Sequence, residues 1–307
     1  MLDQILTGGF LVSLLASTIR LATPIMVPAL GQLYTQRAGI LNLGVEGNML
    51  MGAVAGFAVA YLSGSLWLGL FAGMAVGVLW SAIMAWLSIT MKANQVIAGL
   101  GMNILAGGLA AYCYRVIFGV QSLPPSVSCF PSVQIPVLSD IPVLGPILFQ
   151  HNLLVYLSFL LVPITWFILE KTVFGLKIKA VGEHPRAADS KGISVAGIRY
   201  ASVLIGGLYA GAAGAFMTIA YLNTFTEAVI SGRGYIAVAV VIFARFLPIR
   251  TMWGALLFGF ASALQMRLQA LGVDVANQIM LMLPYVMTII ALIFASNKAE
   301  FPSAYTL

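Results

Sequence analysis

Ionisable side chains gather in one short stretch, residues 182–193, which reads GEHPRAADSKGI. The 307-residue chain is only 8% charged, yet this stretch holds five ionisable side chains: Glu183, His184, Arg186, Asp189 and Lys191. Pro185 suits the first turn of a helix, and Gly192 suits the position just past a helix end. The pattern predicts a short polar helix with Ala187 and Ala188 side by side. It is typical of a docking element for another protein; the alternative is a solvated loop whose charges keep it out of lipid.

A second polar stretch, residues 35–50, reads TQRAGILNLGVEGNML and interrupts an otherwise apolar region. Its polar and charged side chains alternate with three glycines, which weaken a continuous helix. Irregular backbone at membrane depth is tolerated only where it is buried in protein or lines a water-filled cavity. Two interpretations stay open. Asn42, Glu46 and Gly47 either belong to a discontinuous element at a translocation path or form an ordinary turn between two spans.

Neither stretch completes a catalytic set. The sequence has no phosphate-binding loop of the G-x-x-x-x-G-K-[ST] type, so it does not predict ATP binding by that motif. Its two histidines, His151 and His184, are expected on opposite sides of a membrane, and no metal-ligand cluster is found. We therefore expect no catalytic residue, no metal site and no cofactor in this chain, and we do not expect an enzyme.

The composition indicates a membrane protein. Hydrophobic residues make up 61% of the chain, well above the share in soluble domains. We expect a single domain over 1–307, an all-α polytopic helical bundle. The net charge of +6 fits basic cytoplasmic loops better than nucleic-acid binding.

Long uncharged runs mark about nine membrane spans. The run 47–91 is long enough for two helices joined by the YLSGS turn at 61–65. The remaining predicted spans are 8–34, 93–114, 153–169, 197–222, 234–247, 252–270 and 275–296. Six prolines between 119 and 150 exclude a regular helix there and predict an extended, ordered loop.

Basic residues predict the orientation. With Arg37 on the cytoplasmic side, the nine crossings place most of the 15 basic residues there as well: Arg37, Lys92, Lys171, Lys177, Lys179, Arg186, Lys191, Arg199, Arg245, Arg250 and Lys298. The positive-inside rule then puts the N-terminus outside and the C-terminus inside. The proline-rich loop 119–150 is expected in the periplasm and 171–196 in the cytoplasm.

Small residues and cysteines allow two further expectations. Glycines four residues apart form stripes at Gly69, Gly73 and Gly77, at Gly207 and Gly211, and at Gly52 and Gly56, which favours close helix packing. Cys113 and Cys129 are the only cysteines. Free thiols are favoured over a disulfide, although a bridge stays possible if both lie near the outer face.

The two polar stretches resemble a known family. TQRAGILNLGVEGNMLMGA (35–53) and AVGEHPRAADSKGI (180–193) are similar to motifs of bacterial ATP-binding cassette (ABC) importer permeases, in the branched-chain amino acid/ribose superfamily. The chain looks most like the shorter permease of nucleoside and simple-sugar importers, which are served by a BMP-type binding lipoprotein. Gln36 and His184 depart from the family pattern, where Glu and Asn are more usual. The resemblance covers about residues 15–297.

The resemblance implies partners and site residues. The stretch 182–193 matches the cytoplasmic coupling segment that contacts the ATPase, with contact positions Glu183, Pro185, Ala187, Ala188 and Gly192. ATP and Mg²⁺ would be bound by that separate subunit. A companion permease, an extracytoplasmic substrate-binding lipoprotein and membrane lipids complete the expected partners, in the bacterial inner membrane. Asn42, Glu46 and Gly47 match the family's central motif near the pathway, and Asn103 is a further amide available to a neutral substrate.

The expected cargo is a nucleoside, and a pentose or other simple sugar is the alternative. A stand-alone secondary transporter or channel is a different class, which needs ionisable residues inside the membrane. Its candidates are Arg20, Glu46, Arg115 and Glu227, all expected near span ends. A structural membrane scaffold is a third possibility, which would have neither a polar pathway nor an ATPase partner.

Overall fold

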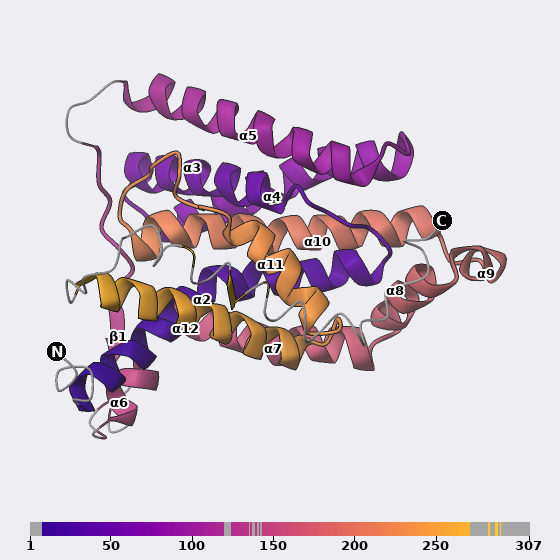
Figure 1. Ribbon diagram of the computed structural model, residues 1–307. Helices are drawn as coiled ribbons and strands as arrows, with labels where there is room; N and C mark the ends of the chain where they lie inside the picture. Colours follow the sequence, from indigo (N-terminus) through magenta and orange to yellow (C-terminus); the bar gives the residue numbers. More distant parts are fainter. Residues whose placement is uncertain are drawn as a thin grey trace.

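The computed structural model describes residues 8–270 except 120–123, 135, 137, 138, 140 and 142, and beyond them only 282, 286, 287 and 289. The described chain is a bundle of long helices that run roughly along one direction (Figure 1). The first helix begins at one end of the bundle, beside the short segments between 124 and 152. The opposite end carries two short helices from the 173–190 region. The bundle therefore has two distinct ends, called here the loop end and the docking end.

Among the described residues, six helices are long and apolar enough to cross a membrane. They are α2 (Gly8–Arg37), α3 (Val45–Ser63), α4 (Leu66–Ala85), α5 (Gln95–Phe118), α7 (Leu153–Lys171) and α10 (Val195–Phe216). Two of them continue into single π-helical turns, α4 at Trp86–Thr90 and α10 at Met217–Tyr221. Each corresponds to a span predicted from the sequence. A polytopic, multi-pass helical membrane protein is therefore confirmed.

The count of nine spans is not confirmed. The predicted span 234–247 is the helix α11 (Arg233–Phe243), whose 11 residues are ~16 Å long at 1.5 Å per residue and cannot cross a hydrocarbon core of ~30 Å. The helix α12 (Pro248–Ala270) is long enough but carries two arginines and does not reach the apolarity of the other six. The predicted span 275–296 lies outside the continuously described residues.

Helix α10 is the centre of the bundle, with α2, α3 and α4 packed around it (Figure 1). The predicted glycine stripes are the contact surfaces. A Cβ on Gly52 of α3 would lie 2.6 Å from the Gly211 Cα, and one on Gly77 of α4 would lie 2.7 Å from that same atom. Side chains there would push the helices apart. The stripes therefore let three backbones meet at one place in α10.

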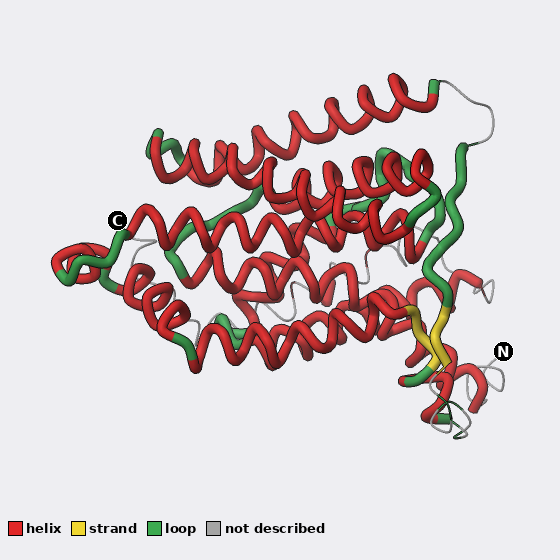
Figure 2. The backbone as a smooth tube through the Cα atoms, turned by 180° about the vertical axis from the view of Figure 1, so that it is seen from behind, coloured by secondary structure: helices red, strands yellow, loops and turns green. Residues whose placement is uncertain are grey.

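The described part of the proline-rich region lies at the loop end and holds regular structure, in contrast to the predicted extended loop. It holds β1 (Ser132–Gln134), α6 (Leu144–Leu148) and β2 (Gln150–Asn152). The two strands pair antiparallel with Val133 opposite His151, and Figure 2 shows them at the end where α2 begins. This small sheet is a departure from the predicted all-α fold. Cys113 and Cys129 are free, as favoured from the sequence.

Candidate functional site

The chain leaves α2 at Arg37 and runs irregularly through 38–44. Helix α3 then starts inside the bundle rather than at its end. Gly39 takes a left-handed conformation (φ +79°), which favours glycine. The first turn of α3 is held by Asn103 of α5: its Oδ1 accepts from the Gly47 N–H at 2.8 Å, and its Nδ2 donates to the Leu43 carbonyl at 2.9 Å. Asn103 is the ninth residue of α5, so this contact lies well inside that helix.

Glu46, at the start of α3, caps a second helix. Its two carboxylate oxygens accept hydrogen bonds from the backbone N–H groups of Gly232 and Gly234, each at 2.7 Å. These residues lie at the N-terminus of α11, where a carboxylate satisfies unpaired N–H groups and is favoured by the helix dipole. A Cβ on Gly234 would lie 2.7 Å from the Glu46 Cα, so glycine is needed for this approach.

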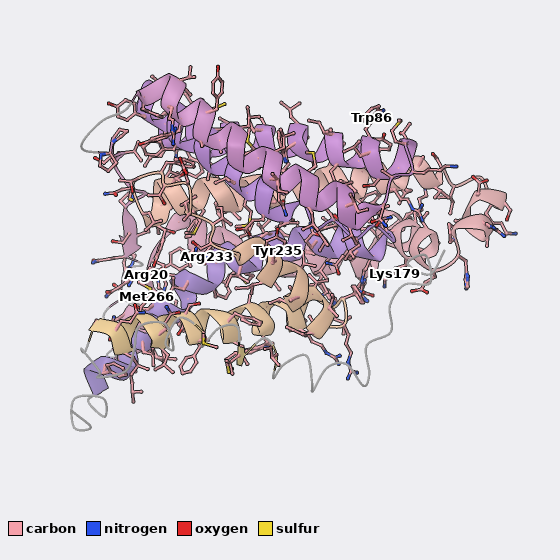
Figure 3. All side chains as sticks on the ribbon, turned by 45° about the horizontal axis from the view of Figure 1, so that its top comes forward. Arg20, Trp86, Lys179, Arg233, Tyr235 and Met266 are labelled. Carbon is pink, nitrogen blue, oxygen red and sulfur yellow. The ribbon has the colours of Figure 1, made fainter. Side chains whose placement is uncertain are left out.

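Two helix N-termini therefore meet inside the bundle. Tyr235 of α11 completes the link, since its hydroxyl accepts from the Asn103 Nδ2 at 2.7 Å. Figure 3 places Arg233 and Tyr235 away from both ends of the bundle. Residues 35–50 are thus buried over most of their length, where the chain passes from α2 to α3.

Buried amides lie in α2, in the segment 38–44 and in the first turn of α3. Asn42 is fully buried, and its Oδ1 accepts from the Gly44 N–H at 2.9 Å. Within the described residues, no protein group pairs with the Asn42 Nδ2, the Asn48 Oδ1 or either amide atom of Gln32. An unpaired buried polar atom costs about 1–3 kcal/mol. These amides supply hydrogen-bonding capacity inside the membrane-spanning region.

The docking end is formed by α8 (Val173–Glu183) and α9 (Pro185–Ser190). Pro185 is at the first turn of α9, and Gly192 ends it with φ +77°, as the sequence predicted. Glu183, Ala187 and Gly192 are exposed. The side chains of α9 are therefore exposed over most of that helix.

Ala188 corrects one expectation. From the sequence we expected both alanines of α9 on the side that faces a partner. Ala188 is only 4% exposed and packs within its own chain, whereas Ala187 points outward. A helix of six residues has a single outward face, and α9 uses the Ala188 side to rest on the bundle.

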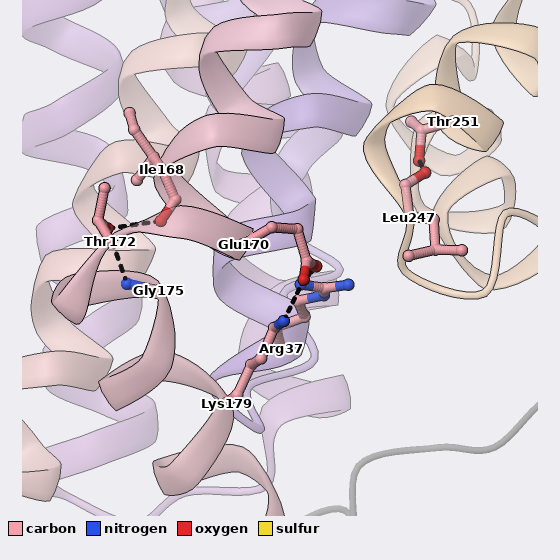
Figure 4. Close-up of polar contacts among 8 residues, drawn as sticks. All are labelled: Arg37, Ile168, Glu170, Thr172, Gly175, Lys179, Leu247 and Thr251. Atoms are coloured by element: carbon pink, nitrogen blue, oxygen red, sulfur yellow. Dashed lines mark hydrogen bonds and ion pairs between the residues drawn. The ribbon is translucent and has the colours of Figure 1, made fainter.

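The docking end and the irregular segment 38–44 are joined at Arg37. The Glu170 carboxylate of α7 accepts from Arg37 at 2.7 Å and from Lys179 of α8 at 2.5 Å (Figure 4). Gly182 of α8 packs against the Arg37 carbonyl so closely that no side chain fits between them. The Arg199 Nε of α10 donates to the Ala38 carbonyl at 3.3 Å. A displacement of α8 would therefore reach the segment that leads to Glu46.

Nothing in the described chain forms a metal site of three or more histidine, cysteine or acidic residues. The two histidines lie at opposite ends, His151 in β2 and His184 between α8 and α9. Burial lowers the pKa of the His151 imidazole below its usual range, and its Nε2 contacts the Ile147 carbonyl at 2.7 Å. This histidine is a neutral structural group of the loop end.

Sequence reasoning missed several residues of the junction. Tyr235, Gly232 and Gly234 were not singled out, although SGRGY at 231–235 carries a turn followed by a helix start. Glu170 was also missed. Its partner Arg37 is distant in the sequence, and its partner Lys179 lies beyond a break between two helices. No local pattern links Glu46 to residues 186 and 188 positions away.

A multi-pass bundle with a broken helical element inside it and a charged element at one end is the architecture of a membrane permease. Comparison with known proteins places it further. Residues 14–292 match the family described as branched-chain amino acid transport system, permease component, and the chain belongs to this family.

Relatives at high coverage carry transporter names. The chain is 40% identical to the putative glucose ABC transporter permease TsgC13 of Haloferax volcanii, over 95% of this chain and 94% of that protein. It is 39% identical to the guanosine ABC transporter permease NupQ of Bacillus subtilis, over 94% and 93%. It is 33% identical to the nucleoside ABC transporter permease NupC of Lactococcus lactis, over 95% and 94%. No solved structure gives a significant match.

Proposed function

We propose that this chain forms half of the translocation pathway of an ATP-driven nucleoside importer. The observation that carries the proposal is the junction where α3 and α11 begin inside the bundle. Transporters often bind a polar solute near the middle of the membrane. They do so with broken helices whose ends and amides face the path. Glu46, Gly47 and Asn103 build this junction, and Asn42 lies near it with an amide nitrogen that pairs with no group of the described chain.

A companion permease covers the other half of the pathway. Tyr235 is 42% exposed and Asn103 is partly exposed, at a depth where lipid offers no hydrogen-bond partner. Helix α5 supports this arrangement, since only 22% of its most apolar part is buried, against 72% for α10. The chain is also similar to two guanosine permeases of Bacillus subtilis, NupQ and NupP, at 39% and 30% identity, which supports pairing of two permeases.

The docking end meets a separate ATPase subunit, which binds ATP and Mg²⁺. Glu183, Pro185, Ala187 and Gly192 form the contact, and Ala188 supports it from within the chain. The Arg37–Glu170–Lys179 cluster then transmits motion of α8 to 38–44 and on to Glu46. The gathering of basic residues at this end supports a cytoplasmic location.

The remaining topology follows from that location. The loop end, including residues 124–152, faces the periplasm of a bacterial inner membrane and receives solute from a binding lipoprotein. The N-terminus lies outside and the C-terminus inside, as an odd number of crossings, nine in the sequence prediction, requires.

A simple sugar is the second candidate cargo, because one relative bears a glucose transporter name. Either cargo is neutral and rich in hydroxyl groups. The junction suits such a solute, since both oxygens of Glu46 are engaged by backbone N–H groups and amides provide the remaining polar atoms. The same engagement disfavours a stand-alone ion-coupled transporter, as does the exposed pairing of Arg115 with Glu227 at 3.4 Å.

Uptake measurements test this proposal. Cells with and without the chain are given labelled guanosine, ribose or glucose, and we expect chain-dependent uptake of guanosine that unlabelled nucleosides compete away. Affinity purification of the chain should also bring an ATPase subunit. Uptake of glucose alone would assign the sugar instead. The proposed class of ATP-driven importer would be contradicted if uptake depended on the chain but was driven by an ion gradient, with no ATPase in the complex.

A further inference from the structure

Two arginines share a cavity on the side of the bundle, near the loop end. Arg20 of α2 and Arg267 of α12 line a cavity of about 300 Å³ together with Ser17, Tyr221 and Met266. Figure 3 shows Arg20 and Met266 close together at that end. Neither the candidate pathway nor the docking end includes these residues.

The cavity is positively charged. The Arg267 Nη2 donates to the Ser13 carbonyl at 3.3 Å and to the Ser17 hydroxyl at 3.4 Å, which leaves other guanidinium donors for a ligand. Arg20 is exposed and forms no ion pair with any described residue. No carboxylate lines the cavity among the described residues. Two adjacent guanidinium groups of this kind attract an oxyanion.

Both arginines lie at a similar distance along their helices from the docking end. Arg20 precedes Arg37, the polar end of α2, by 17 residues, which is ~26 Å of helix at 1.5 Å per residue. Arg267 follows Pro248, the start of α12, by 19 residues, or ~28 Å. The hydrocarbon core of a bilayer is ~30 Å thick. Measured from the docking end, both side chains therefore reach the margin of the hydrocarbon where lipid phosphates begin.

The flank of α12 is suited to lipid tails. Large apolar side chains are exposed along it at Trp253, Leu257 and Phe260, on the stretch that leads toward Arg267. The helix thus presents apolar surface through the core and a cationic cavity at its margin. That combination matches the two ends of one phospholipid molecule.

We propose that Arg20 and Arg267 bind the phosphate of a membrane phospholipid in the leaflet at the loop end. The planar guanidinium groups donate hydrogen bonds to the phosphate oxygens, and the acyl chains follow the exposed face of α12 toward the membrane centre. A free phosphate ion has the same oxyanion chemistry, but it has no tails to occupy that apolar face. The lipid fastens α2 to α12 at this margin.

Native mass spectrometry of the purified complex tests the site. The complex is extracted in mild detergent, delipidated and titrated with phosphatidylglycerol, and separately with inorganic phosphate. We expect wild type to retain one phosphatidylglycerol adduct. The Arg20→Gln/Arg267→Gln variant should reduce the occupancy of this lipid adduct about tenfold. Lysine at both positions should reduce it less, because lysine keeps the positive charge although it lacks the planar guanidinium group.

Arg115→Gln is the matched control, because Arg115 lies at the same end but outside the cavity and pairs with Glu227. It should retain the adduct like wild type. Equal lipid occupancy in wild type and the double glutamine variant would overturn the proposal. Adducts of inorganic phosphate alone would also overturn it. If the double variant does not yield a monodisperse complex, the single variants Arg20→Gln and Arg267→Gln give the same comparison.

Discussion

The junction inside the bundle and the docking end both use a glutamate at a helix terminus, but in opposite ways. At the junction, Glu46 is enclosed and both its oxygens accept from the backbone of α11. At the docking end, Glu183 is the exposed last residue of α8. The enclosed carboxylate fixes two segments of the same chain to one another. The exposed one faces outward from the bundle.

The tolerance of the two regions to change should differ accordingly. At the junction, Gly234 approaches Glu46 so closely that an added Cβ would lie 2.7 Å from the Glu46 Cα. Gly192 of the docking end has no atom near the position of a Cβ. Changes at the junction should therefore act on the chain itself. Changes at the docking end should act on its association with a partner.

The first prediction concerns which side of the membrane each end of the bundle faces. Its readout, labelling of a cysteine, is all-or-none. In a background without Cys113 and Cys129, a cysteine at Ser126 should react with a membrane-impermeant maleimide added outside intact cells, and one at Ser190 should not. Both serines are exposed, so access differs only by side. Permeabilised cells provide the control, in which both should react. The reverse pattern in intact cells would remove the docking assignment.

Glu46→Ala should give the largest change in transport. It leaves the N–H groups of Gly232 and Gly234 unpaired, at a cost of about 1–3 kcal/mol each. For a single donor this corresponds to a change of roughly 5- to 150-fold in an equilibrium constant. We expect uptake to fall by at least about tenfold while the chain still inserts. Glu46→Gln keeps one acceptor oxygen and should lose less. Uptake equal to wild type in both variants would return residues 35–50 to a passive role.

Ala187→Trp and Ala188→Trp compare two adjacent positions of one helix. Ala187 is exposed, so its tryptophan should leave the chain folded and weaken ATPase co-purification. A clash of about 1–3 kcal/mol corresponds to roughly 5- to 150-fold in association. Ala188 is buried, so its tryptophan should lower thermal stability of the permease itself. Loss of the ATPase from the Ala188 variant alone, with unchanged stability, would reverse the assignment of the two faces.

The smallest effect is expected at Glu170, which joins α7 to Arg37 and Lys179. Its ion pairs are partly exposed, and such pairs are worth about 1 kcal/mol or less. Glu170→Gln should therefore reduce ATP-driven uptake by no more than about fivefold, without loss of ATPase binding. Glu227→Gln removes a more exposed pair at the loop end and is the matched control. Equal effects from both variants would argue against a link through Glu170.

Local chemistry explains which features could be predicted from the sequence. The bounds of the long helices follow from uncharged runs, and the α9 cap follows from Pro185 and Gly192, because both depend on residues close in the chain. The partner of Glu46 does not, since α11 lies almost 190 residues further on and only the folded bundle brings them together. The burial of Ala188 likewise depends on how α9 rests on its neighbours.

The start of α3 inside the bundle has a consequence for ions. A helix N-terminus carries about half a positive charge, and Asn103, which caps α3, is neutral. Glu46 lies in the first turn of α3 and caps α11, so its single negative charge offsets the two half charges, and Arg233 at the start of α11 leaves the junction net positive. The resulting field repels cations, as positive helix ends do in selective pores. We expect a path through this junction to conduct neutral solutes while it resists leakage of protons and sodium, which preserves the membrane potential during transport.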